Sequence, residues 1–222
     1  MSNLAVTRVV EDYVTLIWKA FEWPGGTPTT TDLAAQLGVT PSTVSTTLKK
    51  LARDGFIEYE PYGDITLTEA GHALAVRVVR RHRILETYLV HALGMPWDEV
   101  HHEADHLEHA ISDAVLQRMD DALGNPTHDP HGDPIPDARG VVRISHDESL
   151  ADASPPATFQ VTRVSDRSSD LLRYLQSLGI NVGARLRVDE VNAAADAIRL
   201  SIDGARVQLS LSSAAAIRVR PL

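Results

Sequence analysis

The sequence contains no cysteine, which excludes both disulfide bonds and thiolate metal ligands. It also lacks an apolar run of the roughly 18 residues that a membrane-spanning helix needs. Its first residues, MSNLAVTRVVEDYV, do not show the charged start, apolar stretch and small-residue cleavage site of an export signal. We therefore expect a cytoplasmic protein that has no membrane partner.

Positive charge is scarce as well. The chain has 21 lysines and arginines against 30 carboxylates, a formal net charge of −9 and a pI near 5.5. Because phosphate backbones attract basic surfaces, this balance argues against nucleic-acid binding unless cations gather on one face. The 222 residues are enough for one large hydrophobic core or for two or three small ones.

The first part of the sequence predicts three helices followed by a β-hairpin. Apolar residues at helical spacing predict a helix within residues 1–22, and the loop EWPGGTP ends it. A short helix is expected over residues 29–39, with a glycine stop at Gly38, and another over 40–55, with Thr40 as N-cap. The alternating stretch FIEYEPYGDITLT, residues 56–68, predicts the hairpin. This order is typical of a winged helix–turn–helix.

The expected helix over residues 40–55 has two different faces. At about 100° per residue, hydroxyls and cations share one arc, while Val44, Leu48 and Leu51 lie opposite. Short hydroxyls suit base edges and phosphates, and lysine or arginine neutralises the backbone, so a DNA-binding face is predicted. The alternative is an ordinary solvated helix face. The candidate DNA-binding residues are Thr40, Ser42, Thr43, Ser45, Thr46, Lys49, Lys50, Arg53 and Tyr62.

The remainder of the chain predicts two long helices and a small β domain. Helices are expected over residues 68–93 and 97–123, followed by the proline- and glycine-rich connector GNPTHDPHGDPIPDARG. Polar sequence up to about residue 156 predicts a linker. Short alternating segments from 157 onward, an Asp-Gly turn at 203–204 and a short helix near 168–178 predict a small β-barrel.

Residues 100–113, VHHEADHLEHAISD, place imidazoles and carboxylates on one stripe of the second long helix. His101, Asp105, Glu108 and His109 share this stripe, next to an apolar face. Such a stripe is costly unless protonation, pairing or a metal ion relieves it. Upstream, His82 and Glu86 lie four residues apart on one helical face, where an ordinary surface pair is the alternative.

Several motifs together resemble the diphtheria toxin repressor family of metal-dependent transcription regulators, and most of all its actinobacterial manganese branch. The resemblance covers about residues 8–140, and it is looser in the last domain. Its motifs are EDYV (11–14), TPSTVSTTLKKLARDGFIEYEPYG (40–63), LTEAG (67–71), RRHRILETYL (80–89), DEVHHEADHLEHAISD (98–113) and DPHGDPIP (129–136).

The resemblance implies two metal sites. The primary site would use Asp12, Asp105, Glu108 and His109, and the ancillary site His82, Glu86 and His101. The family's ancillary ligands from the third domain align with Ser168 and Leu171, which are unsuitable, so Asp166 or Asp170 would have to substitute. Thr15 stands where the bacillus-like manganese branch has a glutamate, so the double-manganese geometry of that branch is not implied.

The resemblance also implies a fold, a metal and partners. The expected fold is mainly α with small β parts. It comprises a winged helix–turn–helix DNA-binding domain (1–72), a helical metal-binding and dimerisation domain (73–140), a linker (141–156) and an SH3-like, FeoA-like β-barrel (157–222). Iron-type members carry methionine and cysteine at the positions of Asp12 and Asp105, so two oxygen ligands here favour Mn²⁺. Fe²⁺ is the alternative co-repressor, and other divalent transition metals are expected to bind in vitro.

The expected function is a manganese-responsive repressor of metal uptake genes. The implied partners are double-stranded, near-palindromic operator DNA and a second copy of the chain, without a membrane or a small organic substrate. Metal would fix the DNA-binding domains of a dimer at the spacing of successive major grooves. Two rivals are a metallohydrolase, which would use the same side chains to activate water, and a metal-independent regulator. No catalytic residues are predicted.

Overall fold

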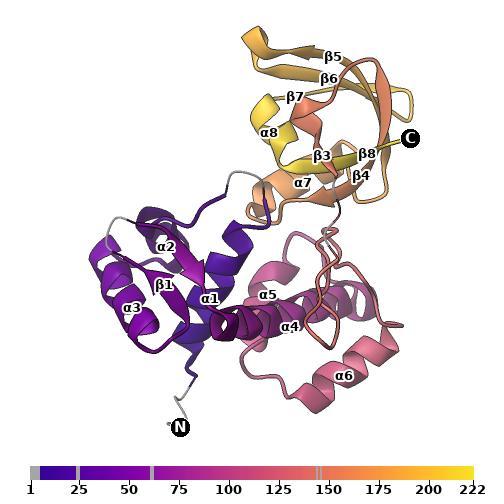
Figure 1. Ribbon diagram of the computed structural model, residues 1–222. Coiled ribbons are helices and arrows are strands. Elements are labelled where there is room, and N and C mark those ends of the chain that lie inside the picture. Colours follow the sequence, from indigo (N-terminus) through magenta and orange to yellow (C-terminus); the bar gives the residue numbers. More distant parts are fainter. Residues whose placement is uncertain (1–5, 24–25, 61–62, 144, 146) are drawn as a thin grey trace. The chain divides into compact units, whose positions relative to one another are not determined.

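The computed structural model describes residues 6–23, 26–60, 63–143, 145 and 147–222. By the contacts within it, the chain divides into two units, residues 1–81 with 136–141, and residues 82–135 with 142–222. Figure 1 shows helices through the first part of the chain and strands through the last. This confirms the expected fold class. The domain boundaries given above stay a prediction.

The first unit contains the helix–turn–helix and the hairpin. Its elements are α1 (Arg8–Ala20), α2 (Thr30–Leu37), α3 (Pro41–Arg53), β1 (Ile57–Tyr59), β2 (Ile65–Leu67) and the start of α4 (Glu69–Leu93). Gly38 ends α2 in the left-handed region, at φ 65°, and Thr40 caps α3 by accepting a hydrogen bond from the Thr43 N–H. β1 and β2 pair antiparallel, which confirms the expected hairpin. Apolar side chains of α1, α2, α3 and the hairpin form one buried cluster.

The second unit begins with the remainder of α4 and continues through α5 (Val100–Leu107) and α6 (Asp113–Ala122). One helix was expected over residues 97–123, and that prediction is wrong. The helix ends at Leu107, and Ser112 adopts an extended backbone and accepts a hydrogen bond from the Val115 N–H, so it caps a new helix. Ile84, Leu116 and Ile135 form the buried cluster beneath these helices.

The last part of the second unit is an antiparallel six-stranded sheet in the order β3-β8-β4-β5-β6-β7. Alternate residues of these strands face a large buried apolar cluster, which also takes in Leu172 and Leu175 from one covering helix. The elements are β3 (Glu148–Ser149), η1 (Leu150–Asp152), β4 (Ala157–Val164), α7 (Ser169–Ser177), β5 (Arg185–Asn192), η2 (Ala193–Ala195), β6 (Ala197–Ile202), β7 (Ala205–Leu209), α8 (Leu211–Ala215) and β8 (Ile217–Pro221).

Part of the stretch expected as a linker is ordered within this domain. Glu148 and Ser149 pair with β8, and Leu150 is completely buried in the core of the sheet. Ala153 is buried in the same core, and the mostly polar composition of the stretch gives no sign of either residue's burial. Among the described residues, no helix combines the length and apolarity needed to cross a bilayer.

Candidate metal centre and DNA-binding helix

The polar face of α3 is exposed as the sequence predicts. Val44, Leu48 and Leu51 are buried on its opposite side. The exposed residues are Ser42, Thr43, Thr46, Lys49, Lys50 and Arg53, and Ser45 is half-buried. Arg53 donates to Asp54 over 2.9 Å, so its charge is partly neutralised within the chain. In the described part of the chain, Lys49 and Lys50 have no such contact with an adjacent carboxylate. They are therefore the cations of α3 best placed to contact a phosphate backbone.

The hydroxyls at the start of α3 form a connected group. The Thr40 hydroxyl lies 2.8 Å from that of Ser42 and 3.0 Å from that of Thr43. A separate pocket of about 630 Å³ lies between α3 and the hairpin, and Ser45, Lys49 and Tyr59 help to line it. Tyr62, the remaining candidate DNA contact, lies outside the described residues.

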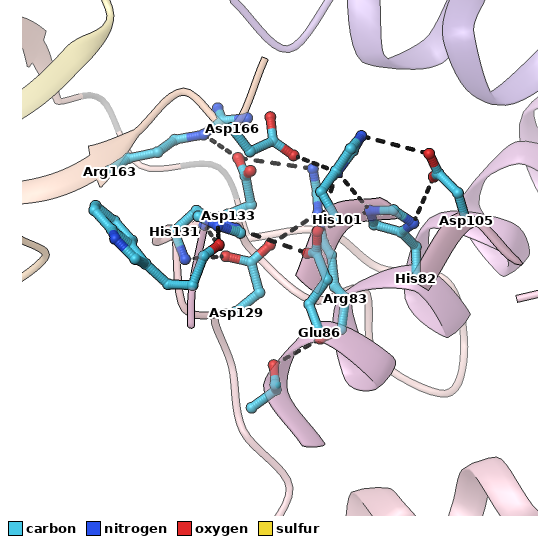
Figure 2. Close-up of polar contacts among 12 residues, drawn as sticks. His82, Arg83, Glu86, His101, Asp105, Asp129, His131, Asp133, Arg163 and Asp166 are labelled. Carbon is cyan, nitrogen blue, oxygen red and sulfur yellow. Dashed lines mark hydrogen bonds and ion pairs between the residues drawn. The ribbon is translucent and has the colours of Figure 1, made fainter. Parts of the chain in front are cut away.

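The predicted metal ligands of the second unit converge on His82, whose side chain is 1% exposed. We call them the His82 group, which consists of His82, Glu86, His101, Asp105, Glu108 and Asp166. His82 Nδ1 lies 2.7 Å from Glu108 Oε2 and 3.3 Å from Asp105 Oδ1. Its Nε2 lies 2.9 Å from Glu86 Oε1 and 3.1 Å from His101 Nδ1. Figure 2 shows His82 facing His101 and Asp105 of the neighbouring helix. Carboxylate oxygens and imidazole nitrogens at this separation suit a divalent metal ion.

The remaining predicted ligands lie at the edge of this group or in the first unit. His109 Nε2 is 3.2 Å from Glu108 Oε1. Asp12 belongs to α1 of the first unit, where it forms an ion pair with Arg8 at 3.9 Å. Its role as a ligand stays a prediction.

The two candidate aspartates of the third domain lie in different places. Asp166 Oδ2 is 3.1 Å from His101 Nδ1, so a residue of the loop after β4 contacts one of the predicted ligands of α5. Asp170 does not join them. Its side chain is 92% exposed and pairs with Arg173 on α7 at 2.5 Å.

A second group of potential ligands was not predicted as such from the sequence. Glu86, Asp129 and His131, here called the His131 group, offer ligand atoms that all lie within 4.8 Å of one another, and all three are buried. One oxygen of each carboxylate and Nδ1 of His131 have no hydrogen-bond partner. Their contacts are longer ion pairs, from Asp129 Oδ2 to Arg83 Nε at 3.7 Å and from Glu86 Oε2 to His131 Nδ1 at 3.8 Å. Buried polar atoms without a hydrogen bond are rare, so these three atoms are candidate donors to a divalent cation. The signal in the sequence was the motif DPHGDPIP, in which Asp129 and His131 lie two residues apart.

Ionisation within the His131 group is strongly perturbed. Burial raises the pKa of Glu86, but the charge of His82 and hydrogen bonds from the neighbouring histidines outweigh it and hold this pKa well below its usual value. Burial lowers the pKa of His131, but the Glu86 carboxylate, whose Oε2 lies 3.8 Å from His131 Nδ1, outweighs burial and raises this pKa to about 10. Burial and the charge of Asp133 raise the pKa of Asp129 well above its usual value. Without a metal, the proton on His131 therefore offsets part of the buried negative charge.

Two arginines contact the loop that contains Asp129, His131 and Asp133. Arg83 is 2% exposed, donates to the Pro134 carbonyl over 2.8 Å, and lies 3.7 Å from both Asp129 and Asp133. Arg163 on β4 forms an ion pair with Asp133, as Figure 2 shows. The loop and the SH3-like sheet are thus linked by opposite charges.

Three family models match the chain. They describe the iron-dependent repressor N-terminal DNA-binding domain (residues 5–65), the iron-dependent repressor metal-binding and dimerisation domain (68–137) and the FeoA domain (148–221). The chain belongs to the diphtheria toxin repressor family. It is a metal-dependent transcriptional repressor of that family.

Relatives of this repressor are named for iron or for manganese. It is 36% identical over 183 residues to the iron-dependent repressor IdeR of Mycobacterium tuberculosis, which covers 76% of this chain and 78% of IdeR. It is 31% identical to the diphtheria toxin repressor of Corynebacterium diphtheriae, with 84% and 78% coverage. A solved manganese-dependent transcriptional repressor in complex with manganese shares 44% identity, with a TM-score of 0.91 over 96% of this chain and 100% of that one.

Proposed function

We propose that this repressor responds to Mn²⁺ and, when loaded with it, binds operator DNA as a homodimer and controls metal uptake genes. The observation that carries the proposal is the His82 group, in which imidazoles and carboxylates from separate elements converge without a sulfur ligand. Hard oxygen donors with imidazole suit Mn²⁺ better than softer ions. The relative solved with manganese supports the same metal.

The proposed ligand sets combine the residues predicted from the sequence with the contacts described above. In the proposal, Asp105, Glu108 and His109 form the primary site, and Asp12 joins them as the family resemblance implies. Glu86 has one oxygen in the His82 group and its other oxygen 3.8 Å from His131 Nδ1. We therefore propose that the second site uses the His131 group, with His82, His101 and Asp166 beside it.

Charge provides the physical basis of the response. A bound divalent cation supplies two positive charges to a region where Glu86, Asp105, Glu108 and Asp166 gather. Without it, these carboxylates repel one another unless protons or histidines compensate them. When that repulsion is removed, one arrangement of α4, α5 and the loop after β4 is stabilised. The metal thus favours this conformation because it binds it with higher affinity than the others.

DNA binding is assigned to the exposed face of α3. In a homodimer two copies of α3 enter successive major grooves, which predicts a near-palindromic operator with half-sites about 10 base pairs apart. Ser42, Thr43 and Thr46 would approach base edges, while Lys49 and Lys50 would contact phosphates. Local cations on α3 thereby compensate for the overall charge of −9.

The test is an anaerobic operator-binding titration on the protein's own promoter region with Mn²⁺, Fe²⁺ or Zn²⁺ at buffered free concentrations. We expect Mn²⁺ to induce binding at free concentrations that leave Fe²⁺ inactive. The double variant Asp105→Ala, Glu108→Ala should lose metal-dependent binding. Its matched control is Glu103→Ala, an exposed carboxylate on the same helix. Equally tight binding in excess chelator would refute the proposal.

Fe²⁺ is the second candidate because the mycobacterial relative with 36% identity is named an iron-dependent repressor. Fe²⁺ also accepts oxygen-rich coordination. Induction of operator binding by Fe²⁺ at lower free concentrations than Mn²⁺ would favour this alternative.

A further inference from the structure

Trp97, in the segment between α4 and α5, contacts His131 in two ways. Its carbonyl oxygen lies 2.7 Å from His131 Nε2 and, as an acceptor, requires the proton on that nitrogen. Its indole ring stacks on the imidazole with 5.6 Å between centroids and 23° between planes. The carbonyl and the ring together fix both the tautomer and the plane of His131.

The same residue also contacts the SH3-like domain. The Trp97 indole N–H donates to Gln176 on α7 over 3.0 Å, and its ring packs against the hydrophobic core of the sheet. The adjacent Asp98, 6% exposed, accepts from Arg173 on the same helix over 2.8 Å. Trp97 and Asp98 therefore fasten the start of α5 to α7.

These contacts determine which atom of His131 can act as a ligand. With the Nε2 proton donated to the carbonyl, a neutral imidazole keeps its lone pair on Nδ1. That atom lies 3.8 Å from Glu86 Oε2 and has no hydrogen-bond partner. A backbone carbonyl that fixes a histidine in this way is a common means of orienting a metal ligand.

We propose that Trp97 is a positioning residue that couples docking of the SH3-like domain to metal binding at the His131 group. The coupling rests on the proposed role of that group as a metal site. Gln176 holds the indole, the indole holds the His131 ring, and the ring presents Nδ1 toward Glu86 and Asp129. By linkage, metal at the His131 group and docking of the SH3-like domain strengthen each other by the same factor.

The experiment measures Mn²⁺ bound per chain from the electron paramagnetic resonance signal of free Mn²⁺. The wild type should bind at two sites. Trp97→Leu keeps the carbonyl and an apolar side chain but removes the stacked ring, and it should weaken the second site by about 10- to 100-fold, as expected for loss of an outer-shell contact. Trp97→Phe should stay close to the wild type, because a phenyl ring can also stack. Trp18→Phe, in the first unit, is the matched control and should change neither site.

A metal-free readout reports docking separately. The Val164 N–H donates to the His131 carbonyl over 2.8 Å, so hydrogen exchange of β4 in chelator reports contact of the sheet with the loop. Trp97→Leu and Gln176→Ala should both speed this exchange, and Gln176→Ala should weaken the second Mn²⁺ site to a smaller extent. Gln176 is an exposed position on α7, so this variant tests the coupling even if Trp97→Leu does not fold.

The outcomes separate the two proposals. A wild type that binds a single Mn²⁺ per chain would remove the His131 group as a metal site. If the wild type binds two and the folded Trp97→Leu protein binds both equally tightly, the positioning role of Trp97 is overturned while the metal site stands. Unchanged second-site affinity and exchange in Gln176→Ala would overturn the coupling to the SH3-like domain.

Discussion

Gly132 offers a direct measure of how the loop of the His131 group depends on the SH3-like sheet. Its φ is +88°, and a Cβ added there would lie 2.1 Å from the Thr162 carbonyl oxygen and 2.9 Å from Arg163 Cα. Both neighbours are backbone atoms of β4, so no side-chain rotation can relieve the clash. The substitution Gly132→Ala should therefore push the loop away from the strand.

The expected magnitude has two parts. A left-handed backbone costs a residue with a Cβ about 1–2 kcal/mol. Moving the loop also breaks the hydrogen bond from the Val164 N–H to the His131 carbonyl, and a buried polar group left unpaired costs about 1–3 kcal/mol. For a chain of this size, about 1 kcal/mol corresponds to about 2–4 °C in Tm.

Gly124→Ala is the matched control, because Gly124 has φ +76° but no atom beyond its own chain neighbours within 4 Å of an added Cβ. It carries the backbone cost alone. Thermal unfolding in chelator should give Gly132→Ala a Tm lower than that of Gly124→Ala by about 2–12 °C, the equivalent of the additional 1–3 kcal/mol. Equal losses of Tm in the two variants would refute the close contact between the loop and β4.

Three further predictions concern DNA, ligands and pH. Lys49→Ala should weaken operator binding equally for all sequences and lower the salt slope by about 1 per protomer in fluorescence anisotropy; an unchanged slope would exclude a phosphate contact. Asp166→Asn should weaken Mn²⁺ binding in equilibrium dialysis, whereas the exposed Asp170→Asn should not; equal effects would contradict the assignment. Because the pKa of His131 is about 10, its ring is protonated near neutral pH. It must lose that proton to bind metal, so second-site affinity should rise about tenfold per pH unit below that pKa; calorimetry showing a flat profile would contradict this.

Local signals explain why the DNA-binding part could be predicted from the sequence. Thr40 caps α3 and Gly38 ends α2 in the left-handed region, and both effects depend on residues adjacent in the chain. The alternation of buried and exposed residues on α3 likewise reflects helical periodicity alone. The structure agrees with the sequence-based prediction where residues adjacent in the chain determine the backbone conformation.

The break between α5 and α6 was missed because helical periodicity continues across it. Leu107, Ile111 and Val115 keep the spacing of one apolar stripe, and neither glycine nor proline interrupts it. The decisive residue is Ser112, whose hydroxyl accepts a hydrogen bond from the Val115 N–H at 3.3 Å. A serine within a periodic stretch is compatible with a continuous helix and also with the N-cap of a new helix, so its presence alone does not predict the break.

The His131 group was missed for a different reason. Glu86 lies on α4, while Asp129 and His131 lie on a loop more than 40 residues later in the chain. Their proximity is a tertiary property, and a proline- and glycine-rich loop carries no periodicity from which to infer it. In contrast, His82 and Glu86 could be paired because they are four residues apart on one helix.

The ion pair between Asp133 and Arg163 joins two parts of the chain that the family models assign to different domains. A truncation that removes residues 157–222 would keep Arg83 beside Asp129 and Asp133. It would remove both Arg163 and Asp166. The loop would then carry more uncompensated negative charge, and the His82 group would lose an oxygen donor. The SH3-like domain thus contributes both a cation and a carboxylate to the surroundings of the proposed metal centre.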